Sequence, residues 1–438
     1  MTSKKEKPAT EAYVWVWLPG QATPVVAGRL AAHEAEYRFV YGRSYLSNRD
    51  AIPIYLPELP LTSDEQRPLN GLIMPSSIRD ASPDAWGRRV MLNRTFGLKG
   101  DTLDSYDLDE LTFLLQSGSD RIGALDFQAS PTKYFARSTK AASLDQLITA
   151  AERVEKNLPL SPELDQALHH GSSIGGARPK ALIEDGDQKF IAKFSSGSDT
   201  FNIVKGEYVA MRLAALCGLN ASPVRIVRAS GKDVLVVSRF DRTATEDGWY
   251  RQSMVSALTI LGLDEMQARY ASYQDLAEKI RHRFKSVTET LRELFSRLVF
   301  NILVGNTDDH ARNHAAFWDG SSLALTPAYD ICPQARTGQE TTQAMLISGR
   351  HRSSQISTCL DAANHFHLDR KAAIELTAQQ LRTIASSWRS VCSEADLGEI
   401  DRYFFWGRQF LNPYAFYGLQ GEATVLSELA DTFRQNNG

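Results

Sequence analysis

The strongest signal in this 438-residue chain is the stretch Gly305-Asn306-Thr307-Asp308-Asp309-His310-Ala311-Arg312-Asn313. Asp308 is followed five positions later by Asn313, and a further aspartate, Asp330, comes a short way on. Phosphoryl transfer needs a carboxylate that orients the acceptor hydroxyl and oxygen ligands that hold a metal against the phosphates. The order and spacing predict Asp308 as the catalytic carboxylate, with Asn313 and Asp330 as Mg²⁺ ligands.

Protein kinases carry a similar arrangement as H-R-D-x-x-x-x-N followed by D-F-G. Neither flanking sequence surrounds Asp308 or Asp330, so we expect kinase-like chemistry outside the ordinary protein kinases. Asp309 is the alternative candidate for the catalytic carboxylate. The five-residue separation from Asn313 favours Asp308, and we expect Asp309 only to help shape the loop. We expect His310 to tie the loop to its lobe and also include it among the nucleotide contacts. Taken alone, Asp308 or Asn313 could equally be an ordinary turn residue, because Asp and Asn favour turns.

Composition sets broad limits. The length predicts two or three structural units. A net charge of -3 argues against an intrinsic nucleic-acid surface, although DNA contact through a partner stays open. The four cysteines are scattered singly, which indicates a reducing cytoplasm. The polar N-terminus and the lack of a long apolar run predict a cytoplasmic protein without a membrane segment.

A glycine-rich segment, residues 171–180, precedes a predicted strand, an Asp-Gly turn and a second strand that carries Lys193. This layout is typical of a kinase N-lobe, where the strand lysine pairs with the nucleotide phosphates. Glu207, on a helix predicted from about 203 to 217, is the expected ion-pair partner of Lys193. Lys189 lies on the same strand face, but apolar neighbours favour Lys193.

The glycine-rich segment is not a Walker A motif, since Ala177 stands where its lysine must be. Backbone N–H groups of residues 173–176 can still cradle phosphate. The stretch 237–242 closes the last strand before the helical part; it is either a nucleotide-contacting hinge or a plain strand end. The candidate nucleotide contacts are Ser173, Ile174, Gly175, Gly176, Lys180, Lys193, Glu207, Ser238, Arg239, Phe240, His310, Asn313 and Asp330.

Periodicity and turn signals divide the chain into a disordered tail (1–11), a β-rich N-terminal subdomain (12–140), a nucleotide-binding part of the N-lobe (141–242) and a helical catalytic lobe (243–438). The predicted fold is α+β. It is two-lobed and protein-kinase-like, with an all-α C-terminal lobe.

Several motifs together resemble the HipA-type toxin kinases of bacterial type II toxin–antitoxin modules. The resemblance covers about residues 12 to 420. Two departures are the loop sequence Ala177-Arg-Pro-Lys180 and Gly206, where relatives carry asparagine. The matching motifs are Ser82-Pro-Asp-Ala-Trp-Gly-Arg-Arg89, Ser173-Ile-Gly-Gly-Ala-Arg-Pro-Lys180, Val237-Ser-Arg-Phe-Asp-Arg242, Asn306-Thr-Asp-Asp-His-Ala-Arg-Asn313 and Leu325-Thr-Pro-Ala-Tyr-Asp-Ile331.

The resemblance implies an ATP- and Mg²⁺-dependent serine/threonine kinase toxin with a role in persistence. It implies autophosphorylation of Ser173, which switches the kinase off, although the adjoining Ser172 leaves the modified serine open. The implied substrate is an aminoacyl-tRNA synthetase, such as the glutamyl enzyme, or another translation protein. The implied partner is a HipB-like helix-turn-helix antitoxin, through which the toxin reaches operator DNA.

Two alternatives remain open from the sequence. A small-molecule phosphotransferase would use the same arrangement of a catalytic aspartate and two metal ligands, here Asp308, Asn313 and Asp330, and would phosphorylate a sugar or alcohol. A non-catalytic co-repressor would only help an antitoxin bind DNA and would transfer no phosphate.

Overall fold

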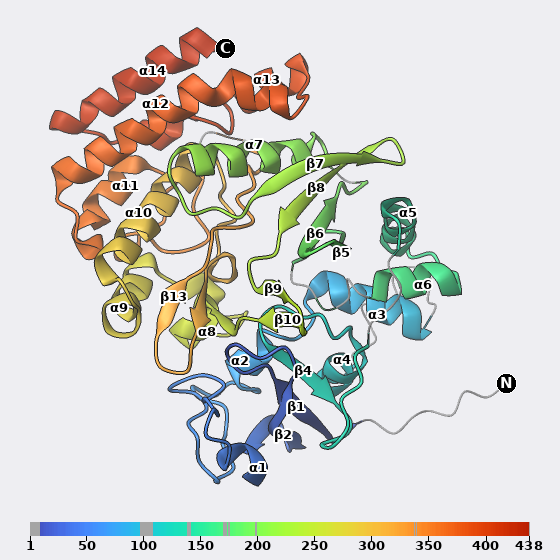
Figure 1. Cartoon of the computed structure of the whole chain (residues 1–438). Helices are drawn as coiled ribbons and strands as arrows, with labels where there is room; N and C mark the ends of the chain where they lie inside the picture. Colours follow the sequence, from blue (N-terminus) through green and yellow to red (C-terminus); the bar gives the residue numbers. More distant parts are fainter. Residues whose placement is uncertain are drawn as a thin grey trace.

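The computed structural model describes residues 9–96, 108–137, 142–169, 173, 176–197, 199–336, 338 and 340–437. A β-rich N-terminal subdomain lies beside a lobe built on a second sheet, and a largely helical lobe completes the molecule (Figure 1). This mixture of sheets and helices confirms the predicted α+β class.

The N-terminal subdomain is an antiparallel four-stranded sheet in the order β3-β2-β1-β4. Its core includes Val14, Val16 and Phe39, which are almost fully buried. The first strand begins at Glu11, one residue inside the predicted tail, of which residues 1–8 lie outside the described part. The elements are β1 (Glu11–Val16), β2 (Val25–His33), β3 (Glu36–Tyr41), α1 (Arg43–Leu46), α2 (Ser76–Arg79), α3 (Ala85–Phe96), α4 (Glu110–Gln116) and β4 (Leu125–Gln128).

The second sheet has the antiparallel order β5-β6-β8-β7. The predicted hairpin is present, with Gly186 at φ +63° in its turn. Alternation along β6 sends Phe190 and Phe194 to one face and Lys193 to the other. The elements are α5 (Leu144–Glu155), α6 (Pro162–His169), β5 (Lys180–Asp185), β6 (Gln188–Phe194), α7 (Ile203–Leu216), β7 (Val224–Ala229) and β8 (Lys232–Ser238).

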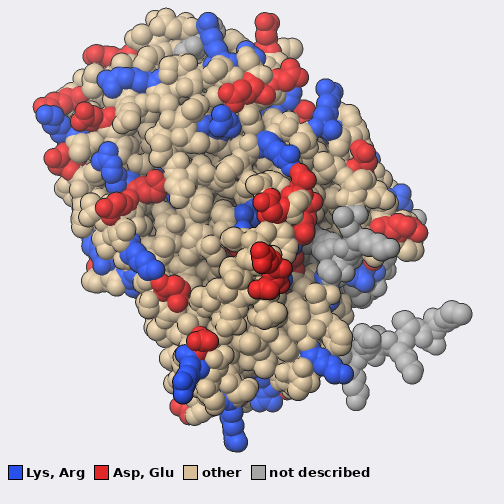
Figure 2. Space-filling view, in the orientation of Figure 1, with Lys and Arg blue, Asp and Glu red and all other residues tan. Residues whose placement is uncertain are grey.

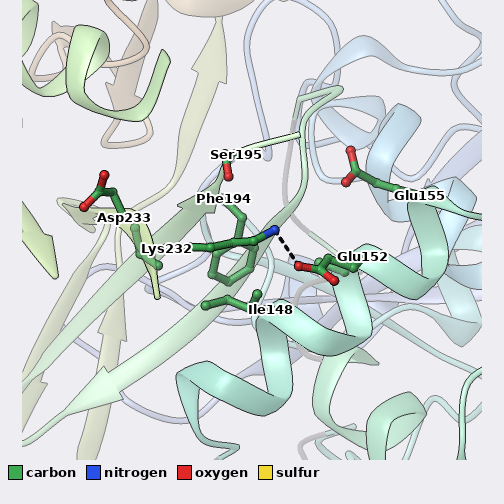
Figure 3. A pocket seen from close by; sticks show the side chains of 9 residues that line it. Ile148, Glu152, Glu155, Phe194, Ser195, Lys232 and Asp233 are labelled. Atoms are coloured by element: carbon green, nitrogen blue, oxygen red, sulfur yellow. Dashed lines mark ion pairs between the residues drawn. The ribbon is translucent and has the colours of Figure 1, made fainter. Parts of the chain in front are cut away.

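Helices α5 and α6 cover the face of this sheet that is opposite to Lys193. Ile148 of α5 and Phe194 of β6 pack in the same apolar cluster. At the edge of this contact Lys232 Nζ lies 2.5 Å from Glu152 Oε1, and the two side chains close a small hollow (Figure 3). Burial of this apolar face directs Lys193 toward the C-terminal lobe.

The C-terminal lobe is mainly helical, but the prediction that it is all-α is wrong. A hairpin of β9 and β10 and a three-stranded sheet β11-β12-β13 lie in it, because short segments far apart in the chain pair with one another, as Phe317 of β12 does with Met254 and Ala324. The elements are β9 (Arg242–Thr245), β10 (Gly248–Arg251), β11 (Met254–Ser256), α8 (Ala257–Leu261), α9 (Tyr273–Arg283), α10 (Val287–Leu303), β12 (Ala315–Trp318), β13 (Leu323–Leu325), α11 (Ile356–Ala362), α12 (Arg370–Glu394), α13 (Glu399–Phe405) and α14 (Thr424–Asn437).

Acidic and basic side chains are interspersed over the face of the molecule drawn in Figure 2, in keeping with the small net charge of -3. None of the helices among the described residues has the combination of length and apolar character that a bilayer crossing requires.

The contact between α7 and α13 joins the two lobes next to Glu207. A Cβ atom on Gly206 would lie 2.7 Å from the ring of Phe405, which is fully buried. Glycine at position 206 therefore lets α13 approach α7 closely.

We predict that Gly206→Ala destabilises the protein. The added methyl overpacks the site at a cost of about 1–3 kcal/mol, and the better helix propensity of Ala offsets at most about 1 kcal/mol of it. Urea unfolding measures the change. Gly398→Ala is the control, because a Cβ there meets nothing within 4 Å. Phe405→Leu should restore part of the loss, and a Gly206→Ala protein as stable as the parent would contradict the prediction.

Candidate active site

A single buried ammonium group joins three elements of the structure. Lys193 Nζ of β6 lies 2.5 Å from Glu207 Oε1 of α7, and it also forms an ion pair with Asp330 Oδ1. Burial alone would lower the pKa of Lys193, but the carboxylates of Asp330 and Glu207 raise it above its ordinary value. The structure therefore brings together three of the predicted site residues and keeps the lysine charged.

Lys189, the alternative lysine, has different partners. Its Nζ lies 2.7 Å from Asp120 Oδ2 and 3.1 Å from Glu184, and it lies 4.8 Å from the ring centre of Trp249. These contacts hold Lys189 against the N-terminal subdomain and away from the group around Lys193.

The predicted catalytic loop, which carries Asp308, leaves α10 through Gly305. Its φ is +73°, and a Cβ there would lie 2.6 Å from the backbone oxygen of Gln409, so only glycine fits. Asp308 is exposed, and its backbone oxygen accepts hydrogen bonds from the N–H of His310 (2.9 Å) and from Nδ2 of Asn313 (3.1 Å). Partial burial raises the pKa of Asp308, and the charge of Asp330 adds to the rise.

Asp309 lies on the opposite side of the same loop. It is 2% exposed, its carboxylate accepts a hydrogen bond from Tyr273 Oη, and it lies 3.1 Å from His314 Nε2. These buried contacts attach the loop to α9, and Asp308 is the more exposed of the two aspartates. The backbone of His310 is part of the same loop: its N–H donates to Asp308 O (2.9 Å), and its carbonyl oxygen accepts a hydrogen bond from the N–H of Asn313 (2.8 Å).

Asp330 adopts an unusual backbone conformation with φ +59°. Burial alone would raise its pKa, but the charge of Lys193 holds the pKa of Asp330 well below its ordinary value. The preceding residue, Tyr329, donates a hydrogen bond from Oη to the backbone oxygen of Arg312 (2.6 Å), which links this segment to the catalytic loop.

The donor set suits Mg²⁺, which prefers oxygen ligands and completes its shell with phosphates and water. Asp330 supplies an ionised carboxylate. The Nδ2 of Asn313 is engaged with Asp308, so its Oδ1 is the atom left for a metal.

The glycine-rich segment is anchored by Trp86 of the N-terminal subdomain. Its backbone N–H donates to Gly176 O (3.2 Å), and its Nε1 donates to Lys180 O (3.0 Å). Gly176 has φ +107°, and a Cβ there would collide with Lys180 Nζ, so the lysine lies directly against this glycine. Ser173 is 2% exposed. The predicted contacts Ile174 and Gly175, and the alternative serine Ser172, lie outside the described residues.

The predicted hinge runs through Ser238, Arg239 and Phe240. The N–H of Ser238 donates to Pro223 O (2.9 Å), and the N–H of Arg239 donates to Lys189 O (2.8 Å). The ring of Phe240 lies 5.7 Å from that of Tyr329, next to Asp330. Phe240 therefore remains a candidate nucleotide contact. The backbone N–H groups of Ser238 and Arg239 are already used in hydrogen bonds to neighbouring backbone oxygens.

The side chain of Arg239 points away from the site and into a buried cluster of charges. It forms ion pairs with Asp120 (3.0 Å) and Asp241 (2.8 Å), and Arg242 shares both carboxylates. The Gly123 N–H also donates to Asp241 (2.8 Å). A nucleotide contact by Arg239 can therefore involve only its backbone.

Comparison with known families identifies the relatives of this chain. A family model of the HipA-like C-terminal domain matches residues 172–388, and one of the HipA N-terminal domain matches residues 16–128. The chain belongs to the HipA family. This assignment confirms the resemblance inferred from the motifs around Asp308 and Asp330.

Individual relatives of this HipA-family protein are distant. The Y4mE protein of Sinorhizobium fredii is 25% identical over 347 residues, which cover 72% of this chain and 76% of that protein. The serine/threonine-protein kinase toxin HipA of Shewanella oneidensis is 24% identical over 183 residues, 36% of this chain and 42% of that protein. The solved complex of Shewanella oneidensis HipA, HipB and operator DNA matches with a TM-score of 0.66 at 19% identity, covering 97% of this chain and 99% of that one. The predicted HipA-type fold is confirmed.

Sequence reasoning missed the residues through which the N-terminal subdomain reaches the site. Glu265 Oε1 accepts from Arg79 Nε (2.7 Å) and from Arg312 Nη2 (2.5 Å), and so joins α2 to the catalytic loop. Asp120 and Trp86 were likewise assigned no role. Of these residues, only Trp86 could have been found from the sequence, because it lies in one of the motifs that resemble the HipA family.

The buried charge cluster yields a stability prediction. Asp241→Asn leaves two buried arginines with one carboxylate, which should cost about 3–5 kcal/mol. Burial alone would raise the pKa of Asp241, but Arg239 and Arg242 lower it. Its ionised form therefore stabilises the fold above the unfolded-state pKa of about 4, and this contribution is lost as the pH falls below that value.

Urea unfolding at pH 7 and pH 3 measures both effects. The difference between parent and Asp241→Asn should be large at pH 7 and smaller at pH 3. The control is Asp185→Asn, in an ion pair with Arg225 whose side chains are 72% and 49% exposed; it should change stability by less than about 0.5 kcal/mol. Equal effects of the two substitutions would contradict the prediction.

Proposed function

We propose that this HipA-family protein is an ATP- and Mg²⁺-dependent serine/threonine protein kinase that acts as a growth-arresting toxin. The observation that carries the proposal is the ion-pair group of Lys193, Glu207 and Asp330. Tyr329, next to Asp330, donates a hydrogen bond to Arg312 O in the loop that carries the exposed Asp308. A strand lysine paired with a helix glutamate, next to a metal-binding aspartate, is the arrangement that kinases use to hold nucleotide phosphates.

Each residue has a separate task in this proposal. Lys193 binds the phosphates, and Glu207 holds the ammonium in place. Asp330 and Asn313 hold Mg²⁺, which when bound neutralises charge on the transferred phosphoryl group. Asp308 orients the acceptor hydroxyl and accepts its proton, and its raised pKa suits a general base.

The family and the fold support the wider biological role. The matching solved complex contains a HipB protein and operator DNA. We infer that this chain likewise associates with a helix-turn-helix antitoxin and reaches DNA mainly through it. A protein of the translation apparatus, such as an aminoacyl-tRNA synthetase, is the proposed substrate, and its phosphorylation would arrest growth and favour persistence.

The catalytic proposal predicts that Asp308→Ala and Asp330→Ala abolish growth arrest on expression. Loss of a general base alone should lower phosphate transfer by about 10²–10⁴-fold. Phosphoproteomics of induced cells, compared with the Asp308→Ala strain, identifies the protein substrate. The control is Asp361→Ala, at an ion pair with Arg370 whose side chains are 67% and 52% exposed. Equal toxicity of all variants would refute a kinase toxin and favour a non-catalytic co-repressor.

The regulatory proposal is autophosphorylation on the glycine-rich segment. Ser173 is buried beside the site, so its phosphorylation requires this segment to move out. We expect one added phosphate on Ser173 or Ser172 after incubation with ATP and Mg²⁺, followed by loss of activity. Intact-mass analysis of the parent, Ser173→Ala and Ser172→Ala decides between the two serines, and phosphate found only elsewhere would overturn the proposal.

A further inference from the structure

A buried cluster of three polar side chains adjoins the predicted catalytic loop and has no part in the proposed chemistry. Asp309 follows Asp308, His314 follows Asn313, and Tyr273 is the first residue of α9. All three side chains are almost fully buried. Polar groups are costly to bury unless hydrogen bonds satisfy them, so the contacts of this cluster indicate what it holds in place.

Asp309 is the centre of this cluster. Its carboxylate accepts a hydrogen bond from Tyr273 Oη, and its Oδ1 and Oδ2 atoms lie 3.1 Å and 3.2 Å from His314 Nε2. The tyrosine hydroxyl also lies 3.4 Å from His314 Nε2, and the two rings meet edge to face with their centres 5.5 Å apart. Each of the three side chains therefore contacts both of the others.

The cluster holds the predicted catalytic loop at both of its ends. Asp309 is the chain neighbour of Asp308, and His314 is the chain neighbour of Asn313, so the contact between Asp309 and His314 keeps the two ends of this segment together. The Asp308 carbonyl oxygen accepts hydrogen bonds from the N–H of His310 (2.9 Å) and from Asn313 Nδ2 (3.1 Å). The backbone that joins Asp308 to Asp309 is thus held both by these hydrogen bonds and by the buried side chain of Asp309.

Tyr273 gives this contact a fixed support. The Ser272 side chain caps α9 by accepting a hydrogen bond from the N–H of Gln274 (3.1 Å). The N–H of Tyr273 itself donates to Leu346 O (2.9 Å). The hydroxyl that reaches Asp309 therefore comes from a helix start whose own backbone is already held.

We propose that Asp309 is a positioning residue for phosphate transfer: with Tyr273 and His314 it keeps the Asp308 carboxylate and the Asn313 side chain at the separation that transfer needs. The inference rests on the proposed kinase function. Asp309 does not touch the acceptor, because its carboxylate is buried in these contacts. A small displacement of a catalytic group is enough to slow a reaction, so the cluster should govern the rate of transfer more than the affinity for nucleotide.

The test measures the rate of phosphate transfer from saturating ATP and Mg²⁺ to the protein itself, followed by intact-mass analysis. Tyr273→Phe removes only the hydroxyl that donates to Asp309, and it should slow transfer on the order of tenfold. Asp309→Ala removes the centre of the cluster and should slow transfer by about 10²-fold. Tyr45→Phe is the matched control, because the buried hydroxyl of Tyr45 also donates a hydrogen bond, to Ile52 O (2.7 Å), but in the N-terminal subdomain; its rate should equal that of the parent.

Two further measurements separate positioning from a general loss of structure. Isothermal titration calorimetry with a non-hydrolysable ATP analogue and Mg²⁺ should give Tyr273→Phe an affinity close to that of the parent, because Lys193 and its partners are unchanged. In an Asp309→Ala background, Tyr273→Phe should cause no further loss of rate, because the two residues act as one unit. Tyr273→Phe alone decides the question if Asp309→Ala does not fold, since it removes a single oxygen atom. Equal losses in both backgrounds, or a loss of affinity as large as the loss of rate, would overturn the proposal.

Hydrogen exchange without nucleotide gives a readout that does not depend on kinase activity. The peptide that spans residues 305–313 should exchange faster in Tyr273→Phe than in the parent or in Tyr45→Phe, and equal exchange in all three would count against the proposal. If the parent binds no nucleotide and transfers no phosphate, the proposed kinase function fails and this inference fails with it. If the parent transfers phosphate and Tyr273→Phe does so at the same rate, only the role of Asp309 fails.

Discussion

The site depends on how one buried charge is neutralised. A lysine ammonium taken out of water is costly unless carboxylates pair with it, and Lys193 has two, Glu207 and Asp330. These carboxylates come from a helix that packs on the sheet and from a loop of the opposite lobe. Pairing therefore draws β6, α7 and the segment after β13 together. The three groups sum to one net negative charge, which suits a site that receives Mg²⁺.

The N-terminal subdomain is part of this arrangement and not an appendage. It touches the hinge through Asp120, the glycine-rich segment through Trp86, and the catalytic loop through Arg79 and its partner Glu265. The hinge contact is buried and shared among several charges, so removal of one of its partners costs far more than loss of an exposed ion pair. The catalytic-loop contact is partly exposed and contributes less. The subdomain thus orients the nucleotide-binding parts from one side.

Much of the catalytic site was predictable because its signals are local. Asp308 and Asn313 belong to one loop, and the hydrogen bond from Asn313 to the Asp308 backbone requires close spacing. The hairpin and the helix that carry Lys193 and Glu207 follow from apolar periodicity and turn residues. The strands of the C-terminal lobe cannot be recognised in the sequence, because strands of three or four residues leave too short a pattern, as in β11 (Met254–Ser256).

The sequence by itself determined the order of the proposed catalytic groups, the family and the elements that carry the site, because each rests on residues near one another in the chain. Only the tertiary structure decided that Lys193 also pairs with Asp330, that Lys189 pairs with Asp120, and that the side chain of Arg239 enters a buried charge cluster. These choices rest on burial and on contacts between segments far apart in the chain, and no local pattern records which distant carboxylate will neutralise a given cation.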